Sequence, residues 1–305
     1  VGLGNIWIFP YLAAKYDGEI FLLVYIILAL TFGYTLIMAE TSLGRMTRKS
    51  PVGAFESFGN SRFISIGGWI NATIPILIVP YYSVIGGWVI KYLIEYFAGH
   101  SKTLAGDAYF TTFISNGWST EICFIIFTLF TLGIIYAGVR NGIERVSKFM
   151  MPILIVLSLI IAVYSVTRPG AIEGVKYFLV PNFDHFSWMT VVSAMGQMFY
   201  SLSIAMGILI TFGSYMKKDT SIEKSTENVE IFDTAIAIMA GLMIIPAVFA
   251  FSGGNAETLK SGPALMFITI PKVFANMGFG TAIGVVFFLL VLFAAVTSSI
   301  ALTES

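Results

Sequence analysis

The sequence predicts an all-α polytopic membrane protein, and three observations support this. Of the 305 residues, 57% are hydrophobic and 11% are charged, whereas soluble domains average roughly 45–50% and 25%. Several long stretches lack Asp, Glu, Lys and Arg, and each has about the ~20 residues that a helix needs to cross ~30 Å of hydrocarbon. The stretches also lack the alternation typical of barrel strands, so helices are expected to satisfy the backbone in the membrane.

The charge-free stretches give the expected segments in chain order. Seven stretches are of full length, and they are 20–39, 63–90, 122–139, 149–167, 186–216, 234–256 and 273–303. An eighth, 1–14, is cut short by the start of the chain. Because the chain starts at Val1 and stops at Ser305 directly after an apolar run, we expect it to be a piece of a longer protein.

The basic residues indicate an orientation. Three alternate loops, 40–62, 140–148 and 217–224, contain ten of the 17 basic residues, namely Arg45, Arg48, Lys49, Arg62, Arg140, Arg145, Lys148, Lys217, Lys218 and Lys224. The positive-inside rule places these loops in the cytoplasm, together with the N-terminus of this chain. The remaining loops, which are 15–19, 98–120, 168–185 and 257–272, are then expected outside.

Small residues mark two places where a helix can break. Gly2 and Gly4 precede Asn5 in the first segment, and the middle of 186–216 contains Ser201, Ser203, Ala205 and Gly207. A pair of interrupted helices five segments apart is typical of an inverted-repeat transporter with a site at mid-membrane. The alternative is that these small residues only let helices pack closely.

Other function classes have less support. Cys123 lies inside a membrane run, where a small buried apolar residue is the simpler interpretation, and one cysteine gives no basis for a disulfide or metal site. A net charge of zero argues against a nucleic-acid partner. No ring of charges or carbonyl filter loop suggests a channel, and no nucleophile and base pair suggests an enzyme.

The run Val1–Pro10 (VGLGNIWIFP) resembles the first helix of the neurotransmitter:sodium symporter family, whose fold is that of the bacterial leucine transporter. Further similar motifs are Tyr81-Tyr82, Gly142–Pro152, Gln197–Ser203, Ser261–Pro263 and Ala294–Ser298. The resemblance implies two inverted five-helix repeats with helices 1 and 6 broken. The first repeat would cover 1–167, and 168–305 would hold segments 6 to 8 of the second, with the C-terminal helices absent from this chain.

The resemblance also implies a substrate site. The backbone amides of Leu3 and Gly4 would hold a substrate carboxylate with the Tyr82 hydroxyl, although Tyr82 is alternatively a packing residue. Gly2 stands where monoamine carriers of the family have an aspartate, so the substrate would bring its own carboxylate. The other matched positions are Ile78, Tyr200, Ser201, Ser203, Ala205, Met206 and Ser298. Because most of these are apolar, a neutral hydrophobic or aromatic amino acid fits best.

Two Na⁺ sites follow from the same resemblance. The first, Na1, would use Asn5, Ser201, Asp233 and the substrate carboxylate. The second, Na2, would use the hydroxyls of Thr297 and Ser298 with backbone oxygens of Val1 and Ala294. All of these are oxygen ligands, which suit a hard cation. Without ions, Thr297 and Ser298 would be helix-packing hydroxyls.

Asp233 is the most informative acid in the sequence. It falls roughly eleven residues, or ~16 Å, into a helix that is expected to start near Ile222. A carboxylate at this depth is functional by default, and it could replace the chloride that some relatives need beside Na1. The alternative is a helix-end acid facing the cytoplasm, in line with Glu227 and Glu230 at three-residue spacing.

Three features depart from the family pattern or remain open. Ile8 stands where the family usually has an arginine that forms the outer gate. Pro80 is expected to interrupt the segment 63–90. The Gly142–Pro152 motif is associated in the family with unwinding of the fifth segment, and its alternative is a loop that ends at Gly142 before a helix starting near Pro152.

The sequence therefore predicts a sodium-coupled symporter of a neutral hydrophobic or aromatic amino acid, independent of chloride, which works by alternating access in the cell membrane. Its partners would be the amino acid and membrane lipid. The alternative is a non-transporting amino-acid sensor or scaffold on the same fold, which the missing gate arginine favours.

Overall fold

A computed structural model describes residues 2–16, 18–59, 61–253 and 264–305, and within them only helices and connections occur. In chain order the elements are η1 (Gly4–Ile8), α1 (Phe9–Lys15), α2 (Gly18–Leu28), η2 (Ala29–Gly33), α3 (Tyr34–Thr47), α4 (Pro51–Glu56), α5 (Arg62–Phe97), α6 (Ser101–Leu104), α7 (Tyr109–Ser115), α8 (Gly117–Tyr136), η3 (Val139–Ile143), α9 (Glu144–Val166), α10 (Ala171–Leu179), η4 (Phe183–His185), α11 (Trp188–Ser201), α12 (Ile208–Tyr215), α13 (Ile222–Ser252), η6 (Leu265–Thr269), α14 (Ile270–Ala275) and α15 (Gly280–Glu304). The all-α prediction is confirmed.

Six helices of the described residues are long and apolar enough to span a membrane. They are Ile20–Thr47, Arg62–Phe97, Gly117–Tyr136, Glu144–Val166, Ile222–Ser252 and Gly280–Glu304. Each contains most of one predicted charge-free stretch. The one full stretch that is left, 186–216, forms two shorter helices, α11 and α12, with a non-helical link between them.

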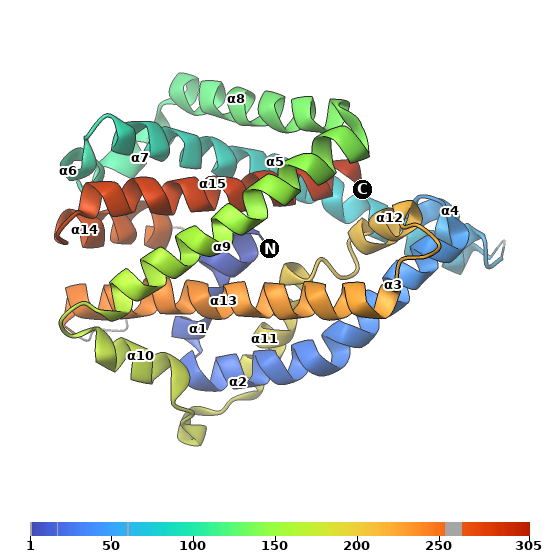
Figure 1. Cartoon of the computed structure of the whole chain (residues 1–305), viewed down its shortest axis with the longest axis horizontal. Coiled ribbons are helices and arrows are strands. Elements are labelled where there is room, and N and C mark those ends of the chain that lie inside the picture. The colour runs from blue at the N-terminus through green and yellow to red at the C-terminus, as the bar shows by residue number, and fades with distance from the viewer. Residues whose placement is uncertain (1, 17, 60, 254–263) are drawn as a thin grey trace.

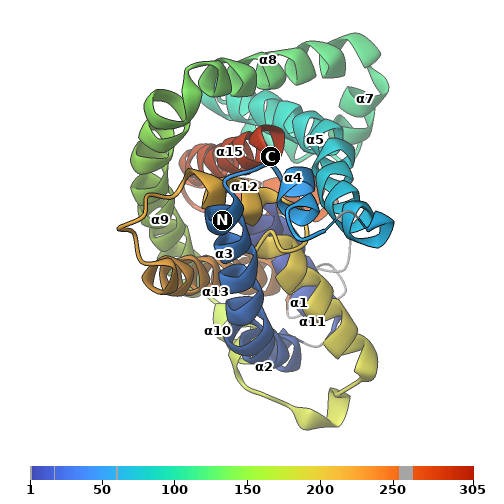
Figure 2. The same ribbon diagram turned by 90° about the vertical axis from the view of Figure 1, so that its right-hand side faces the viewer.

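The long helices form a bundle in which α9 crosses and packs against both α13 and α15 (Figure 1). Helix α15 also packs against α5, and α5 is covered on its other side by α8. Seen from the end, α12 lies beside α3 and near α4 (Figure 2). The segment η1–α1 is enclosed, with the ring of Phe9 in edge contacts with Phe21, Tyr25 and Phe178.

The outer surface is apolar where the long helices face outwards. Leu30 on η2, Leu77 on α5 and Leu129 on α8 are 63%, 71% and 63% exposed. Single exposed leucines are ordinary in soluble proteins, but many large apolar side chains on the outer faces of several helices are not. These helices are therefore built to lie against lipid.

The sixth segment is broken as its small residues predict. Helix α11 ends at Ser201 and α12 begins at Ile208. Between them Ser203, Ala205 and Gly207 have φ angles of 58°, 61° and 72°. These left-handed conformations cannot continue a right-handed helix, and those of Ser203 and Ala205 are unusual for residues other than glycine.

The described part of the first segment starts beside the expected break. Gly2 is not helical, and a widened π-helical turn, Gly4–Ile8, leads into α1. The amides of Asn5 and Ile6 both donate to the Gly2 carbonyl, at 3.1 and 3.3 Å. Val1, a predicted ligand, lies outside the described residues, as does the Ser261–Pro263 motif.

One prediction about helix continuity, the interruption at Pro80, is wrong, and so is the alternative of a loop that ends at Gly142 before a helix starting near Pro152. Helix α5 continues through both Pro75 and Pro80, because an otherwise long and packed helix tolerates the loss of one backbone donor per proline. Helix α9 begins at Glu144 and includes Pro152, so no loop extends towards Pro152. Gly142 has a packing reason instead, since a Cβ there would lie 2.1 Å from the Ile134 carbonyl oxygen.

The predicted loops also contain more helix than expected. The stretch 40–62 begins inside α3 and includes α4, so Glu40 belongs to a helix. The stretch 98–120 holds α6 and α7, and 168–185 holds α10. Charge marks where a chain can leave the hydrocarbon, but it does not mark where a helix ends.

Candidate substrate and sodium site

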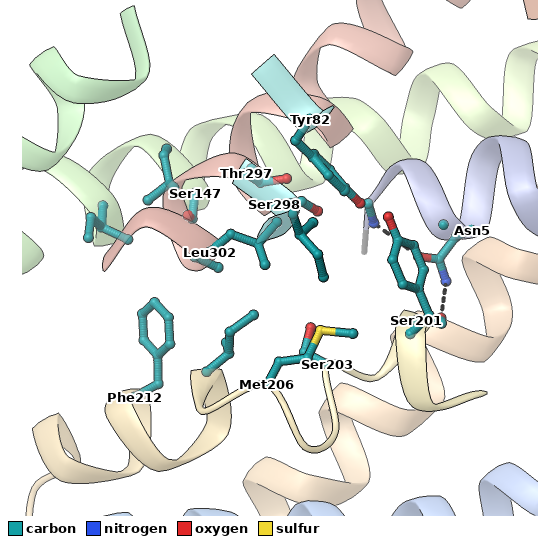
Figure 3. A pocket seen from close by; sticks show the side chains of 18 of the residues that line it. Asn5, Tyr82, Ser147, Ser201, Ser203, Met206, Phe212, Thr297, Ser298 and Leu302 are labelled. Atoms are coloured by element: carbon teal, nitrogen blue, oxygen red, sulfur yellow. Dashed lines mark hydrogen bonds between the residues drawn. The ribbon is translucent and has the colours of Figure 1, made fainter. Parts of the chain in front are cut away.

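A cavity of about 220 Å³ lies between the break in the sixth segment and residues of η1, α5, α9 and α15 (Figure 3). Nine of the predicted substrate positions line it, namely Gly2, Gly4, Ile78, Tyr82, Tyr200, Ser201, Ser203, Met206 and Ser298. Leu3 and Ala205 do not line it. Eight further lining residues that were not predicted as site residues are Ile143, Ser147, Met151, Ile208, Phe212, Ile300, Ala301 and Leu302.

Gly2 and Gly4 allow the backbone to approach its neighbours closely. A Cβ on Gly2 would lie 1.9 Å from Ser298 Oγ and 3.5 Å from the Tyr82 hydroxyl, and a Cβ on Gly4 would lie 2.8 Å from the Tyr200 ring. Real atoms do not approach this closely, so a side chain at either position would force Ser298 or Tyr200 to move. An aspartate in place of Gly2 would displace the Ser298 side chain from the position that it has here.

Tyr82 faces the start of the first segment. Its side chain is buried, and its hydroxyl faces the backbone of Leu3 and Gly4 and the side chains of Tyr200 and Ser298. Tyr82 therefore meets two backbone donors at the end of the cavity away from Ser147 and Phe212 (Figure 3). Such a cluster of N–H and O–H groups at the start of a helix is suited to a carboxylate.

The three residues predicted for Na1 come together and are connected by hydrogen bonds. Asn5 Nδ2 donates to Ser201 Oγ at 2.9 Å and to the Asp233 carbonyl at 3.1 Å, and Ser201 Oγ donates to Asp233 Oδ2. Asn5 Oδ1 accepts the Gly2 amide at 2.9 Å. The hydroxyl of Ser201 and the carboxylate of Asp233 are therefore adjacent oxygens of the kind that hold a hard cation. Asn5 turns its nitrogen towards them, so its Oδ1 would have to leave the Gly2 amide to become a third ligand.

Tyr25 joins this cluster and was not foreseen. Its hydroxyl lies 3.2 Å from both Ser201 Oγ and Asp233 Oδ2, and its side chain is fully buried. A buried tyrosine hydroxyl usually has a hydrogen-bond partner, so its position in the charge-free stretch 20–39 was a signal. The sequence could not show which helix supplies that partner.

Asp233 lies inside α13, which starts at Ile222 as predicted. Its side chain is 2% exposed and contacts Ser201 and Tyr25. The alternative of a solvated helix-end acid is therefore wrong for Asp233, whereas Glu227 is exposed. A buried carboxylate in such a place needs compensation by hydrogen bonds or a cation.

The described Na2 residues lie along one turn of α15. The Thr297 hydroxyl donates to the carbonyls of Phe293 and Ala294 at 3.0 and 3.2 Å. Threonines make this back-bond in many helices, so the contact suits a packing hydroxyl as well as an ion ligand. Ser298 points instead to the cavity, beside Gly2.

The unwound link of the sixth segment is held by polar side chains that the sequence did not single out. The Ala205 amide donates to Glu40 Oε1 at 2.8 Å, and the Gly207 amide donates to Asn71 Oδ1 at 3.2 Å. Gln197 Nε2 donates to the Gly4 carbonyl at 2.9 Å. Backbone groups that leave a helix at this depth need such partners.

Comparisons with known proteins identify the family of this chain. A family model described as "Sodium:neurotransmitter symporter family" matches residues 1–124 and 111–305. The sodium-dependent transporter YhdH of Bacillus subtilis is 34% identical over 307 residues, which cover 100% of this chain and 67% of YhdH. Human sodium- and chloride-dependent GABA transporter 2 is 26% identical over 354 residues, covering 100% of this chain and 58% of that protein.

The crystal structure of MhsT in complex with L-phenylalanine superimposes with a TM-score of 0.91 at 36% identity, covering 100% of this chain and 69% of MhsT. The chain thus spans about two thirds of the length of YhdH and MhsT. Members of the matched family are transporters and not enzymes. From the family model, from the identity to YhdH and from the shared fold it follows that the chain belongs to the sodium:neurotransmitter symporter family.

Proposed function

We propose that this chain carries the substrate and sodium sites of a symporter that couples Na⁺ to a neutral hydrophobic or aromatic amino acid. The observation that carries the proposal is the gathering of the Leu3 and Gly4 amides with the Tyr82 hydroxyl beside Gly2. At position 2 the chain has glycine packed against Ser298 and therefore no protein carboxylate. The substrate then supplies that charge.

The side walls support an uncharged side chain. None of the described residues that line the cavity is charged, and apolar ones such as Ile78, Met206 and Phe212 form much of its surface. An ionic side chain would be buried there without a partner, at a cost of several kcal/mol. The similar protein MhsT was crystallised with L-phenylalanine, which is consistent with this class.

We further propose two sodium sites and no chloride requirement. Na1 would lie among Asn5, Ser201, Asp233 and the substrate carboxylate, and Na2 beside Ala294, Thr297 and Ser298. Asp233 already supplies a negative charge to the first cluster, so an anion beside it would add repulsion. Support for this comes from the contacts of Asp233 with Tyr25 and Ser201.

Uptake by the full-length protein in proteoliposomes tests the proposal. Radiolabelled phenylalanine should accumulate with an inward Na⁺ gradient and not with K⁺. Tyrosine should compete with it at least ten-fold better than tyramine, a difference of about 1.4 kcal/mol, because tyramine lacks the carboxylate. Equal competition by the two would refute the role of the amide cluster.

A second candidate function is a non-transporting amino-acid sensor. The observation that favours it is Ile8, an apolar residue at the junction of η1 and α1, where the family resemblance leads one to expect a gate arginine. A sensor would bind phenylalanine in a Na⁺-dependent way in detergent but would give no uptake in the same proteoliposomes. Binding together with uptake would exclude it.

For the membrane arrangement, we propose insertion in the cell membrane with the loops rich in Arg and Lys in the cytoplasm. The structure places the ends of α3 and α12 and the start of α13 at one end of the bundle (Figure 1), and Arg45, Arg48, Lys217 and Lys218 lie there. A cysteine at Lys49 should react with membrane-impermeant maleimide only after the cells are opened. Labelling in intact cells would reverse the orientation.

A further inference from the structure

A second pocket lies outside the transport site, where α3 ends beside the connection from α12 to α13 (Figure 1). We call it the basic pocket; its volume is about 510 Å³ and it is lined by Ser42, Arg45, Met46, Arg48, Lys218 and Ile222. One part of the lining is cationic, and Met46 with Ile222 makes another part apolar. The pocket is therefore amphiphilic.

Two of the three cations in the basic pocket are oriented by backbone carbonyls. Arg45 donates to the carbonyls of Lys218 and Thr220, and Arg48 donates to the Ser214 carbonyl at 2.8 Å. None of the three cations forms an ion pair with a carboxylate of the described residues. The carbonyls orient the two guanidinium groups but leave their charge and several donors available.

Arg48 gives a second sign that its side chain is used. It caps α3 in the left-handed conformation, with φ of 55°. Glycine takes this conformation without strain and is the usual residue at such a cap. An arginine here brings a cation to the end of the helix, next to Lys218, at some conformational cost.

The basic pocket lies where lipid headgroups are expected. The continuous helix Ile20–Thr47 has 28 residues and is thus ~42 Å long at ~1.5 Å per residue. The hydrocarbon core is only ~30 Å thick, so the last turns of the helix reach into the headgroup layer. Met46 is 66% exposed and continues the apolar outer face of this helix towards the pocket.

We propose that the basic pocket binds the phosphate of an anionic phospholipid. Arg45, Arg48 and Lys218 would surround the phosphate, and Met46 and Ile222 would contact the glycerol and the first acyl carbons. Guanidinium groups bind phosphate oxygens in paired hydrogen bonds, and basic clusters at the membrane surface attract anionic lipids. The apolar part of the lining favours a lipid over free phosphate.

Occupation of the pocket would act on the transport machinery. The loop that Arg45 and Arg48 hold joins α12, which carries Phe212 of the cavity, to α13, which carries Asp233. Arg45 lies in the last turn of α3 and Arg48 caps it, and Glu40 of the same helix holds the unwound link. A lipid phosphate bound to Arg45, Arg48 and Lys218 would therefore connect the end of α3 to the loop between α12 and α13. The binding itself does not depend on the proposed substrate.

Native mass spectrometry of the purified protein in nanodiscs tests this. The lipids are phosphatidylcholine with a minor share of phosphatidylglycerol. The affinity for phosphatidylglycerol should fall at least ten-fold in Arg48→Gln/Lys218→Gln. The control Lys49→Gln/Lys224→Gln removes the same charge from the same end of the molecule but from residues that do not line the pocket, and it should change the affinity less than two-fold. Equal losses in both variants would show diffuse surface attraction and overturn the proposal.

Two further experiments test whether a loss of lipid binding reflects the charge of Lys218 or a change of fold, and whether the pocket prefers lipid to free phosphate. Lys218→Glu leaves the hydrogen bonds of Arg45 and Arg48 intact, because Lys218 contributes only its carbonyl to them. The affinity of Lys218→Glu for phosphatidylglycerol should fall about as much as that of Arg48→Gln/Lys218→Gln, while its melting temperature in phosphatidylcholine stays unchanged. Displacement of the lipid by millimolar inorganic phosphate would show that the pocket is a site for free anions, which refutes the lipid assignment.

Discussion

Removing the charge of Asp233 is the sharpest test of the sodium site. In Asp233→Asn the side-chain shape is kept, and the amide oxygen can still accept the hydrogen bonds that Tyr25 and Ser201 donate to Asp233 Oδ2 in the wild type. What is lost is one negative charge in a side chain that is 2% exposed. The variant therefore separates charge from geometry.

The size of the effect follows from Coulomb's law. Two unit charges ~4 Å apart attract by about 4 kcal/mol at an effective dielectric constant of ~20, and each ~1.4 kcal/mol is ten-fold in affinity. Since the free carboxylate is itself stabilised by Tyr25 and Ser201, part of this is offset. We expect the sodium affinity to fall about 100-fold or more.

The assay is phenylalanine binding and uptake over a range of Na⁺ concentrations, with chloride or gluconate as the anion. Wild type should be indifferent to the anion, and Asp233→Ser, which vacates space, should regain part of its activity in chloride. Glu227→Gln is the matched control, because it removes an exposed carboxylate from the same helix, and its sodium dependence should stay within two-fold. A wild-type activity that collapses in gluconate would refute the reasoning, as would an Asp233→Asn protein with unchanged sodium affinity.

Three further changes test other contacts. In a titration assay, Gly2→Ala should lower the affinity for phenylalanine at least ten-fold because its Cβ would lie 1.9 Å from Ser298 Oγ. The control Gly196→Ala, whose Cβ would have nothing within 4 Å, should leave the affinity unchanged. Recovery of the affinity in Gly2→Ala/Ser298→Gly would identify the clash as the cause. Thr297→Ala/Ser298→Ala should shift the sodium dependence of uptake to higher concentrations while Ser299→Ala does not, and an unchanged dependence would make the pair packing hydroxyls. Glu40→Ala leaves the Ala205 amide without its acceptor and should cost about 1–3 kcal/mol of stability, seen as a lower melting temperature, whereas Glu40→Gln keeps an acceptor and should melt near wild type. A Glu40→Ala protein that melts at the wild-type temperature would show that the contact is dispensable.

Composition and charge were enough to predict the helices, because the length of an apolar run directly reflects the thickness of the hydrocarbon. The break between Ser201 and Ile208 was also predictable from its small residues. The sequence was misleading at Pro80 and left two interpretations open before Pro152; in both helices the packing outweighs one missing donor at the proline. Charge was misleading at Glu40, which bounds an apolar run and yet lies inside α3.

For the site, the family resemblance indicated the residues, and the fold explains why they meet. Asn5, Ser201 and Asp233 are up to 228 positions apart, and no local pattern links them. Tyr25, Glu40 and Asn71 were missed for the same reason, since each acts on a backbone or carboxylate group of a distant helix. Their need for a partner is visible in the sequence, but the identity of the partner is a property of the fold.

Asn5 connects the sodium cluster to the substrate amides, and this predicts how the two ligands influence each other. Its Oδ1 accepts the Gly2 amide, and its Nδ2 donates to Ser201 and to the Asp233 carbonyl. A cation at Asp233 and a carboxylate at the Leu3 and Gly4 amides would therefore order the same short stretch, so either ligand reduces the cost of binding the other. Thermodynamic linkage requires the two effects to be equal. Phenylalanine should raise the sodium affinity by the same factor by which sodium raises the phenylalanine affinity. In Asn5→Ser, whose shorter side chain cannot bridge to Asp233, both factors should fall by the same amount, as measured by calorimetry of each ligand with and without the other. The coupling that remains would come from direct contact between the substrate carboxylate and the ion, and a coupling factor unchanged in Asn5→Ser would show that this contact carries all of it and that Asn5 does not connect the two sites.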